Sequence, residues 1–258
     1  MKLVFLGTGT SQGVPVVGCA CAVCRSPDPR DKRWRTSAAL LIQGRVWIID
    51  TGPDLRAQLL TARLPTLDAV LFTHAHKDHT AGLDDVRPFN YLQGKRIPLY
   101  GDSQTLGQIR REYAYAFDGP PYPGLPQFSL WEIEPYAPFS LQGVEVKPFL
   151  VWHYKLAVLG FRIGGLVYIT DASAIPEESW PYLYEAEVLV LNALRREPHI
   201  SHFHLEAAIE VVQKVRPRQA YFTHISHLLG RHAEVEKELP PPIRLAYDGL
   251  VVRLANPS

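Results

Sequence analysis

The stretch THAHKDHT occupies positions 73–80 and directly follows the mainly apolar run LDAVLF. On an extended segment, side chains two residues apart point the same way, so His74 and His76 can bind one metal ion. A turn into a helix at Asp78 would direct that carboxylate and His79 toward a second ion. A solvated histidine-rich loop is the alternative, but such a loop needs no apolar run before it. The stretch therefore predicts a binuclear metal site at the end of a buried strand.

Composition limits the classes of partner. The chain has 258 residues, 47% of them hydrophobic, which suits one domain over residues 1–258. Because 27 Lys and Arg nearly balance 26 Asp and Glu, no general positive field is available to hold a nucleic acid. A small anionic substrate is compatible with this charge balance. No segment approaches the ~18 apolar residues of a membrane span. The amino-terminal apolar run is too short for a signal peptide. We expect a cytoplasmic protein without membrane contact, and a homodimer as the default assembly.

Segments with strand character alternate with helical patterns. The predicted strands are residues 2–6, 38–42, 45–49, 69–72, 97–100, 144–150, 160–163, 166–169, 188–191, 220–222 and 244–246. The predicted helices are residues 53–62, 103–113, 176–184 and 205–215. The last of these, LEAAIEVVQKV, has its apolar residues on one stripe and is followed by Pro217.

The connections between these segments indicate the fold class. Glycine-containing turns at 43–44 and 164–165 join close strand pairs, as in β-hairpins. The proline-rich residues 118–127 are predicted to form a loop, either a plain connector or a lid over the site. Hairpins with interspersed helices indicate an α+β fold of two sheets with helices outside, rather than one parallel sheet.

Three cysteines, Cys19, Cys21 and Cys24, form a C-x-C-x2-C motif. An odd number of cysteines in a chain without an export signal argues against a disulfide framework. Thiolates at this spacing can converge on one soft ion, which predicts a zinc-binding loop near residues 18–25. A tetrahedral structural site needs four ligands, so the motif lacks one. A distant histidine would complete the site, and three free thiols are the alternative.

Three further metal-binding side chains follow apolar strand-like segments. His153 comes after VKPFLVW, Asp171 after LVYIT and His224 after QAYFT. Because each stands at the end of a predicted strand, all three can converge on one rim of a two-sheet sandwich, beside the first histidine cluster. The residues thus predict one site assembled from distant parts of the chain.

These motifs make the chain similar to the metallo-β-lactamase superfamily, and within it to the phosphoribosyl 1,2-cyclic phosphate phosphodiesterases of phosphonate catabolism. The resemblance rests on GTGTSQGVPVVGCACAVC at 7–24, THAHKDH at 73–79, TDAS at 170–173 and THISH at 223–227. It implies a four-layer αββα sandwich, the metallo-β-lactamase fold, with two divalent metal ions at one edge of the sheets. A water or hydroxide bridging the two ions would act as the nucleophile.

The resemblance also implies the ligands, residue by residue. One ion would be held by His74, His76 and His153. The other would be held by Asp78, His79 and His224, with Asp171 bridging the two ions. A separate structural zinc would be bound by Cys19, Cys21, Cys24 and His227. Nitrogen and oxygen ligands accept Zn or Mn, so the sequence does not identify the catalytic metals.

A proton donor for the leaving group is expected at the entry of the helix at 205–215. The resemblance selects His202 as the general acid, or as a donor to the substrate phosphate, with His199 ranked second. The related enzymes carry an acid where this chain has His204, so its substrate contacts differ from theirs. Asp78 is expected to serve catalysis through its metal. Asp50 is expected to accept a ring N–H from a ligating histidine, with a turn-forming role as the alternative.

These features predict a metal-dependent phosphodiesterase that hydrolyses a small cyclic phosphate or a related diester. A hydrolase of thioesters, lactones or lactams is the alternative within the same fold, because the same nucleophile attacks a carbonyl carbon. A non-catalytic metal-binding accessory protein of cofactor biosynthesis is a further alternative. The presence of all seven site positions argues against the last, because a scaffold would tolerate their loss.

Overall fold

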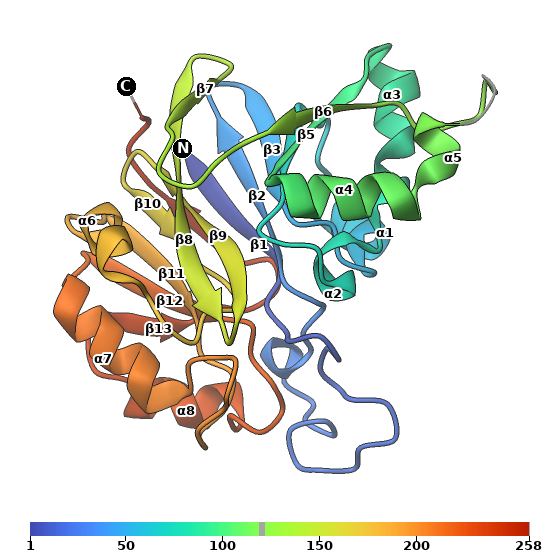
Figure 1. Cartoon of the computed structure of the whole chain (residues 1–258). Coiled ribbons are helices and arrows are strands. Elements are labelled where there is room, and N and C mark those ends of the chain that lie inside the picture. Colours follow the sequence, from blue (N-terminus) through green and yellow to red (C-terminus); the bar gives the residue numbers. More distant parts are fainter. Residues whose placement is uncertain (119–121, 258) are drawn as a thin grey trace.

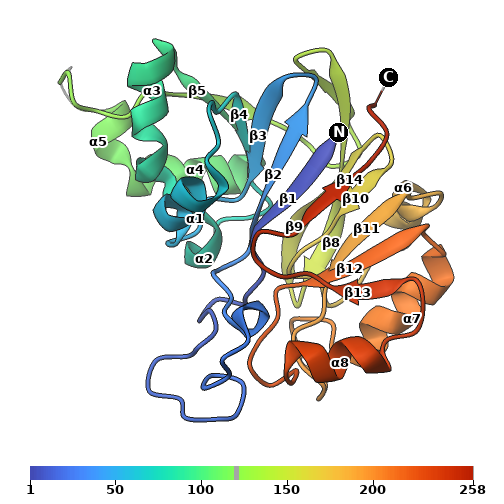
Figure 2. The ribbon, with the colours of Figure 1, turned by 180° about the vertical axis from the view of Figure 1, so that it is seen from behind.

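The computed structural model describes residues 1–118 and 122–257, and in this part of the chain two mixed β-sheets pack face to face (Figure 1). Helices cover the outer surface of each sheet, and the view from behind shows the same layering (Figure 2). The predicted four-layer αββα sandwich is confirmed. Within the described ranges no helix combines the length and the apolar composition needed to cross a membrane.

The first sheet has the spatial order β14, β1, β2, β3, β4, β5, β6. Its strands are Lys2–Gly7 (β1), Ser37–Ile42 (β2), Arg45–Ile49 (β3), Ala69–Leu71 (β4), Ile97–Gly101 (β5), Phe128–Glu132 (β6) and Val251–Arg253 (β14). The strands from β14 to β3 pair antiparallel, whereas β3 to β6 pair parallel.

The second sheet repeats this plan in the order β13, β12, β11, β10, β9, β8, β7. Its strands are Phe139–Leu141 (β7), Val144–His153 (β8), Leu156–Ile163 (β9), Leu166–Tyr168 (β10), Val188–Asn192 (β11), Gln219–Thr223 (β12) and Ile243–Leu245 (β13). Here β7 to β10 pair antiparallel and β10 to β13 pair parallel. Because parallel strands end at one edge, this arrangement brings several loops together there.

The helices are Leu55–Ala62 (α1), Lys77–Thr80 (α2), Arg87–Gln93 (α3), Ser103–Glu112 (α4), Ala114–Phe117 (α5), Trp180–Leu183 (α6), Leu205–Val215 (α7) and His232–Glu238 (α8). Apolar side chains of α1, α3 and α4 pack on the outer face of the first sheet. Those of α6, α7 and α8 pack on the second sheet. Helix α7 has the predicted bounds, because its apolar stripe faces the sheet and Arg216 ends it in a left-handed conformation.

A third apolar layer lies between the two sheets. Phe5 and Trp47 of the first sheet and Phe161 and Tyr168 of the second are almost fully buried there. Each side chain of this size stabilises the fold by about 1.5–3 kcal/mol through loss of water contact. The sandwich interior is therefore a packed core, and the site must lie at an edge.

Several element bounds differ from the predicted ones. The helix predicted over 176–184 is a 3-10 turn at Glu177–Ser179 followed by the short α6, which has proline in its first turn. Strand β8 extends to His153, so this residue is its last member. Strands β6, β7 and β14 and helices α3, α5 and α8 were not predicted, because short elements carry little periodicity. Part of the predicted proline-rich loop, residues 119–121, lies outside the described residues.

Candidate metal centre

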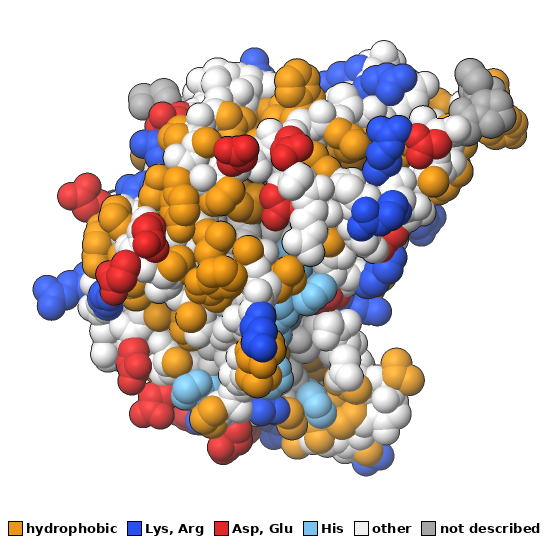
Figure 3. All heavy atoms as spheres, viewed as in Figure 1, with side chains coloured by type: hydrophobic (Ala, Val, Ile, Leu, Met, Phe, Trp, Pro, Cys, Tyr) orange, Lys and Arg blue, Asp and Glu red, His pale blue; other side chains and the backbone are white. Residues whose placement is uncertain are grey.

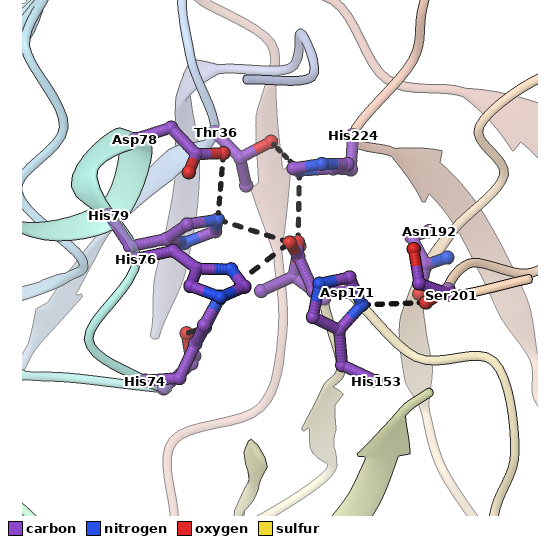
Figure 4. Close-up of polar contacts among 12 residues, drawn as sticks. Thr36, His74, His76, Asp78, His79, His153, Asp171, Asn192, Ser201 and His224 are labelled. Atoms are coloured by element: carbon purple, nitrogen blue, oxygen red, sulfur yellow. Dashed lines mark hydrogen bonds and ion pairs between the residues drawn. The ribbon is translucent and has the colours of Figure 1, made fainter. Parts of the chain in front are cut away.

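The predicted metal-binding side chains meet at the carboxyl ends of the strands, at one edge of the sandwich (Figure 4). The segment after β4 carries His74, His76, Asp78 and His79. The other donors come from β8 and from the residues after β10 and β12: His153, Asp171 and His224. Strand ends from both sheets therefore contribute, which explains how positions so far apart in the sequence build one site.

The carboxylate of Asp171 lies at the middle of this group. Its Oδ1 is 3.0 Å from Nδ1 of His224. Its Oδ2 is 3.4 Å from Nε2 of His79 and 3.7 Å from Nε2 of His74. Asp78 joins on the other side, with Oδ2 3.3 Å from Nε2 of His79. Donor atoms at these separations surround spaces in which a cation can be shared, and both oxygens of Asp171 face such spaces.

The donors fall into overlapping groups whose ligand atoms lie within 4.8 Å of one another. One group is Asp78, His79, Asp171 and His224, and another is His74, His76 and Asp171. The first group has the same members as the set implied by the resemblance, the second contains two of its three histidines, and Asp171 is common to both. The predicted third histidine of the second group, His153, instead gathers with Asp171 and His202. Its ring nevertheless lies 5.1 Å from the ring of His76, between centroids.

Two buried nitrogens show that the site fits a cation. Nε2 of His74 and Nε2 of His79 are buried and have no hydrogen-bond partner among the described residues. A buried polar atom without a partner is costly, so these nitrogens are suited to a metal ion. Burial alone would raise the pKa of Asp171, but the imidazoles of His224 and His79 hold it well below its usual range. The central carboxylate is therefore ionised and offers the negative charge that a cation needs.

Asp50, after β3, fixes the orientation of His79. Its Oδ2 lies 2.7 Å from Nδ1 of His79, which leaves the opposite ring nitrogen facing Asp171. The same carboxylate accepts hydrogen bonds from the backbone N–H and the hydroxyl of Thr73. Asp50 is fully buried, and burial raises the pKa of its carboxyl group. The predicted contact with a ring nitrogen is present, and a role limited to forming a turn does not explain it.

Three site residues have a strained backbone. Asp50, Asp171 and His224 have φ values of +63°, +56° and +54°, in the left-handed region that non-glycine residues seldom adopt. Asp50 and His224 stand directly after β3 and β12, and Asp171 is the third residue after β10, so each turn aims its side chain into the shared edge. Such strain persists only where the surrounding structure over-determines it, and it concentrates at functional sites.

Two other donors, His153 and His224, have supporting contacts that the sequence did not predict. Nδ1 of His153 lies 2.6 Å from the carbonyl oxygen of Ser201, so it donates and leaves Nε2 for the site. Thr36 and Thr10 contact the two ring nitrogens of His224, at 3.1 Å from Nδ1 and 3.2 Å from Nε2. These partners lie far from the donors in the sequence. Of the three, only Thr10 belongs to a motif on which the family resemblance rests, GTGTSQG.

The histidines before α7 lie beside the centre in different ways. The ring centroid of His202 is 4.5 Å from that of His153 and 4.9 Å from that of His224. Burial, followed by the neighbouring His224, lowers the pKa of His202 to about 3. His199 is half-buried, 5.2 Å from His202 between ring centroids. His204 occupies the N-cap position of α7. His202 is thus the member of this trio that reaches the donors.

The cysteine motif forms a second cluster. Cys19, Cys21, Cys24 and His227 each offer one ligand atom, and these atoms lie within 4.8 Å of one another. Nδ1 of His227 is 3.4 Å from Sγ of Cys19 and 3.3 Å from Sγ of Cys21. The backbone N–H of Cys24, followed by the His227 ring, lowers the pKa of the Cys21 thiol to about 6. The histidine nominated from the resemblance thus lies where a fourth ligand is needed.

Comparison with known proteins agrees with this architecture. Residues 45–225 match the model of the beta-lactamase superfamily domain. A crystal structure described as a new diphosphatase from the PhnP family is 37% identical and covers 99% of this chain and 98% of its own, with a TM-score of 0.93. Zinc-bound PqqB from Methylobacterium extorquens has a TM-score of 0.80, covering 98% of this chain and 100% of its own, but is 21% identical and shows the fold alone.

A curated relative of this chain is larger. The octanoyltransferase of Porphyromonas gingivalis is 40% identical over 252 residues, which are 97% of this chain and 51% of that protein. The chain therefore spans about half the length of this relative. Coenzyme PQQ synthesis protein B from Methylobacterium radiotolerans is 31% identical over 123 residues, 42% of this chain and 40% of that protein. With its αββα sandwich and its metal-binding edge, the chain belongs to the beta-lactamase superfamily, whose fold implies divalent metal ions.

Proposed function

We propose that the chain is a metal-dependent phosphoesterase that hydrolyses small phosphodiesters, with cyclic phosphates first among them and diphosphates next. The observation that carries this proposal is the arrangement of six further donors around Asp171, in a chain 37% identical over 99% of its length to a diphosphatase of the PhnP family. Diesters and diphosphates share the chemistry of nucleophilic attack at phosphorus. The substrate is a small anion, and we infer no nucleic-acid partner, because the net charge is only +1.

The proposed ligand sets are those that the family resemblance implies, and the grouping of the donors around Asp171 supports them. His74, His76 and His153 would hold one ion; Asp78, His79 and His224 would hold the other, with Asp171 between them. Two divalent ions, Zn or Mn, would ionise a shared water and neutralise charge on the phosphoryl oxygens. Asp50 and the Ser201 carbonyl would keep the ligating histidines in the required orientation.

His202 is proposed to hydrogen-bond the substrate phosphate through a neutral ring N–H, or to give a proton to the departing oxygen once the negative charge of the bound phosphate raises its pKa. Its ring lies next to two donor histidines, and its Nδ1 is buried without a hydrogen-bond partner among the described residues. His199, further out, is the second candidate for the same role. The cysteine cluster with His227 is proposed to bind a separate structural zinc, whose ligands are thiolates that suit this metal.

Cleavage of an acyl ester or thioester is the second candidate function. One observation favours it: the relative named octanoyltransferase is 40% identical to this chain. The match covers only half of that protein, so the transferase activity can belong to its other half. A carbonyl substrate would use the same centre, because metal-activated water attacks carbon as well as phosphorus.

A substrate panel separates the two functions. The protein is loaded separately with Zn or Mn and is given a ribose cyclic phosphate, a 2′,3′-cyclic nucleotide, bis(p-nitrophenyl) phosphate, ADP, an octanoyl thioester and a β-lactam. Asp171→Asn serves as the matched inactive control. We expect the phosphoesters to be turned over with the highest kcat/KM. A higher kcat/KM for the thioester, lost in the control variant, would replace the phosphoesterase assignment with the acyl one.

A further inference from the structure

The hairpin turn between β8 and β9 lies beside the metal centre. His153 pairs with Leu156, so Tyr154 and Lys155 are the two residues of the turn. We propose that these two residues form a substrate-binding lip: the Tyr154 ring stacks on a planar ring of the substrate, and Lys155 binds an anionic group other than the reacting phosphate. The proposal rests on the proposed function, because it takes His153 as a metal ligand.

The composition of this turn differs from that of the other two-residue hairpin turns. Among the described residues, the comparable turns are Gln43 with Gly44, Gln142 with Gly143, and Gly164 with Gly165. Each of these contains glycine, as the left-handed conformation of such turns favours. Gly164 has φ +56° and Tyr154 has φ +57°, each at the first turn position. Gln43 and Gln142 hold the same first position with φ +49° and +54°, and glycine follows each of them. Of these four turns, the Tyr154 turn is the one that contains no glycine.

Packing does not explain the tyrosine. Its side chain is 52% exposed, so its ring gains little from burial. A large residue in the left-handed region is an outlier that requires some other reason. The three glycine-containing turns follow β2, β7 and β9, whereas the Tyr154 turn directly follows a donor of the metal centre. A ring exposed at that place is available to a bound substrate.

The turn is held firmly against the centre. The backbone N–H of Tyr154 donates to Oγ of Ser173 at 2.9 Å, and this hydroxyl donates to the carbonyl oxygen of Trp152 at 3.0 Å. Ser173 is two residues after Asp171, the central carboxylate. The lip is thus fixed to both the β8 donor and the bridging donor, so little motion has to be lost when a substrate binds.

Lys155 supplies charge at the same place. Its Nζ lies 5.3 Å from the centroid of the Tyr154 ring. Lys155 takes part in none of the ion pairs found in the described part of the chain. In Figure 3 basic and hydrophobic side chains lie beside the histidines near the tip of the β8–β9 hairpin. The substrate class that fits is a phosphoester with a planar ring and a second anionic group.

Two variants test the two residues separately. For Lys155→Gln we expect KM for adenosine 2′,3′-cyclic phosphate 5′-phosphate to rise about fivefold, because an exposed ion pair is lost. KM for adenosine 2′,3′-cyclic phosphate, which lacks the second anion, should change less than about twofold. For Tyr154→Gly we expect KM to rise about tenfold for both nucleotides, through loss of stacking.

Stability provides the structural control. Tyr154→Gly removes the strained φ, so its melting midpoint should equal or exceed that of the parent protein. Gln142→Gly, in the distant β7–β8 turn, should leave both KM values unchanged. A Lys155→Gln variant with equal KM changes for the two nucleotides, or with none, would overturn the role of Lys155. An unchanged KM in Tyr154→Gly, or a lower midpoint, would overturn that of Tyr154.

A binding measurement separates this proposal from the proposed function. Calorimetric titration of the zinc-loaded protein with adenosine 5′-methylenediphosphonate, an ADP analogue whose P–C–P bridge resists hydrolysis, measures binding without turnover. Weaker binding of this analogue by Lys155→Gln and Tyr154→Gly, but not by Gln142→Gly, supports the lip even if no phosphoester is hydrolysed. In that case the phosphoesterase assignment fails and the lip stands. Equal affinity for the analogue in all four proteins, with diester turnover intact, would remove the lip and leave the function.

Discussion

The metal centre and the cysteine cluster both gather donors from distant parts of the chain, but they are held in different ways. At the centre, the donors stand at or after strand ends, four of the seven are buried, and some have supporting partners, such as Asp50 for His79. The cluster lies on a loop outside both sheets, where Cys19 and Cys21 are half-exposed and only His227 comes from elsewhere (Figure 1). Strand ends and their supporting contacts position the centre, whereas for the loop at the cluster we propose that a bound ion holds its shape.

The largest expected effect concerns the centre. Asp171→Asn should lower kcat/KM for bis(p-nitrophenyl) phosphate on the order of a thousandfold, about 4 kcal/mol of transition-state stabilisation. Asparagine tolerates the left-handed φ of this position, so the fold should persist. Steady-state kinetics and circular dichroism provide the measurement. A variant that kept the full rate would show that Asp171 does not bridge the ions.

Cys21→Ser tests the cysteine cluster, where we expect a loss of stability rather than a loss of catalytic rate. Loss of a structural zinc removes part of the folding free energy, and we expect the melting midpoint to fall by about 5–10 °C. Elemental analysis should find one zinc fewer per chain, with the ions of the centre retained. Val17→Ser, at a fully exposed position of the same loop, is the control and should change neither quantity. Equal metal content in the two variants would contradict the proposed zinc.

His232 contacts the residues at the base of the cysteine loop: its backbone N–H donates to Oδ1 of Asp31 at 2.7 Å, and its Nδ1 lies 3.2 Å from Nη2 of Arg33. Burial, followed by the charges of Arg33 and Arg30, lowers the pKa of His232 from 6.5 to about 4. Between these values the unfolded chain binds the proton and the folded chain does not. Stability therefore falls as the pH drops through this window, by up to about 3 kcal/mol.

Urea unfolding of the parent protein and of His232→Gln at pH 6.5, 5 and 4 measures this dependence. We expect the free energy of unfolding to fall less steeply in the variant. Burial raises the pKa of Asp248 to about 6, which acts in the opposite direction, but both proteins share that contribution. Parallel pH profiles would show that His232 is not protected from protonation in the folded state.

Asp50→Asn tests whether the orientation of the His79 ring controls metal binding at the centre and not at the cysteine cluster. Because the Asp50 carboxylate holds the His79 ring, its loss should weaken metal binding at the centre by about 10- to 100-fold. Competition with a chelator measures the affinity. The zinc of the cysteine cluster should be released as before, since no contact joins Asp50 to that loop among the described residues. Equal weakening of both sites would mean that the substitution damages the fold in general.

The smallest effect is expected for Thr10→Val, which keeps the volume of the side chain but removes its contact with Nε2 of His224. Metal affinity at the centre should fall by about tenfold or less. Thr61→Val, at an exposed position, is the matched control. The same chelator assay applies. A decrease as large as that of Asp50→Asn would place Thr10 among the principal supports of the centre.

Much of the candidate site could be predicted from the sequence, because its signals are local. The THAHKDHT stretch shows its donors through spacing alone, and His153, Asp171 and His224 each follow an apolar strand. Helix α7 had the predicted bounds, since eleven residues carry a clear period. The resemblance supplied His227, which no local spacing to the cysteines indicates. Strands of three residues, such as β7 and β14, carry too little pattern to be predicted.

By itself the sequence determined the fold class and indicated the candidate donors, through periodicity and spacing, which are properties of neighbouring residues, and through the family resemblance. The tertiary structure alone decided which partners orient those donors: the Ser201 carbonyl for His153 and the Thr10 hydroxyl for His224. It also placed an exposed tyrosine beside the centre, in a hairpin turn without glycine. These contacts join residues far apart in the chain, and they exist only after two sheets have packed against one another and brought their strand ends to one edge.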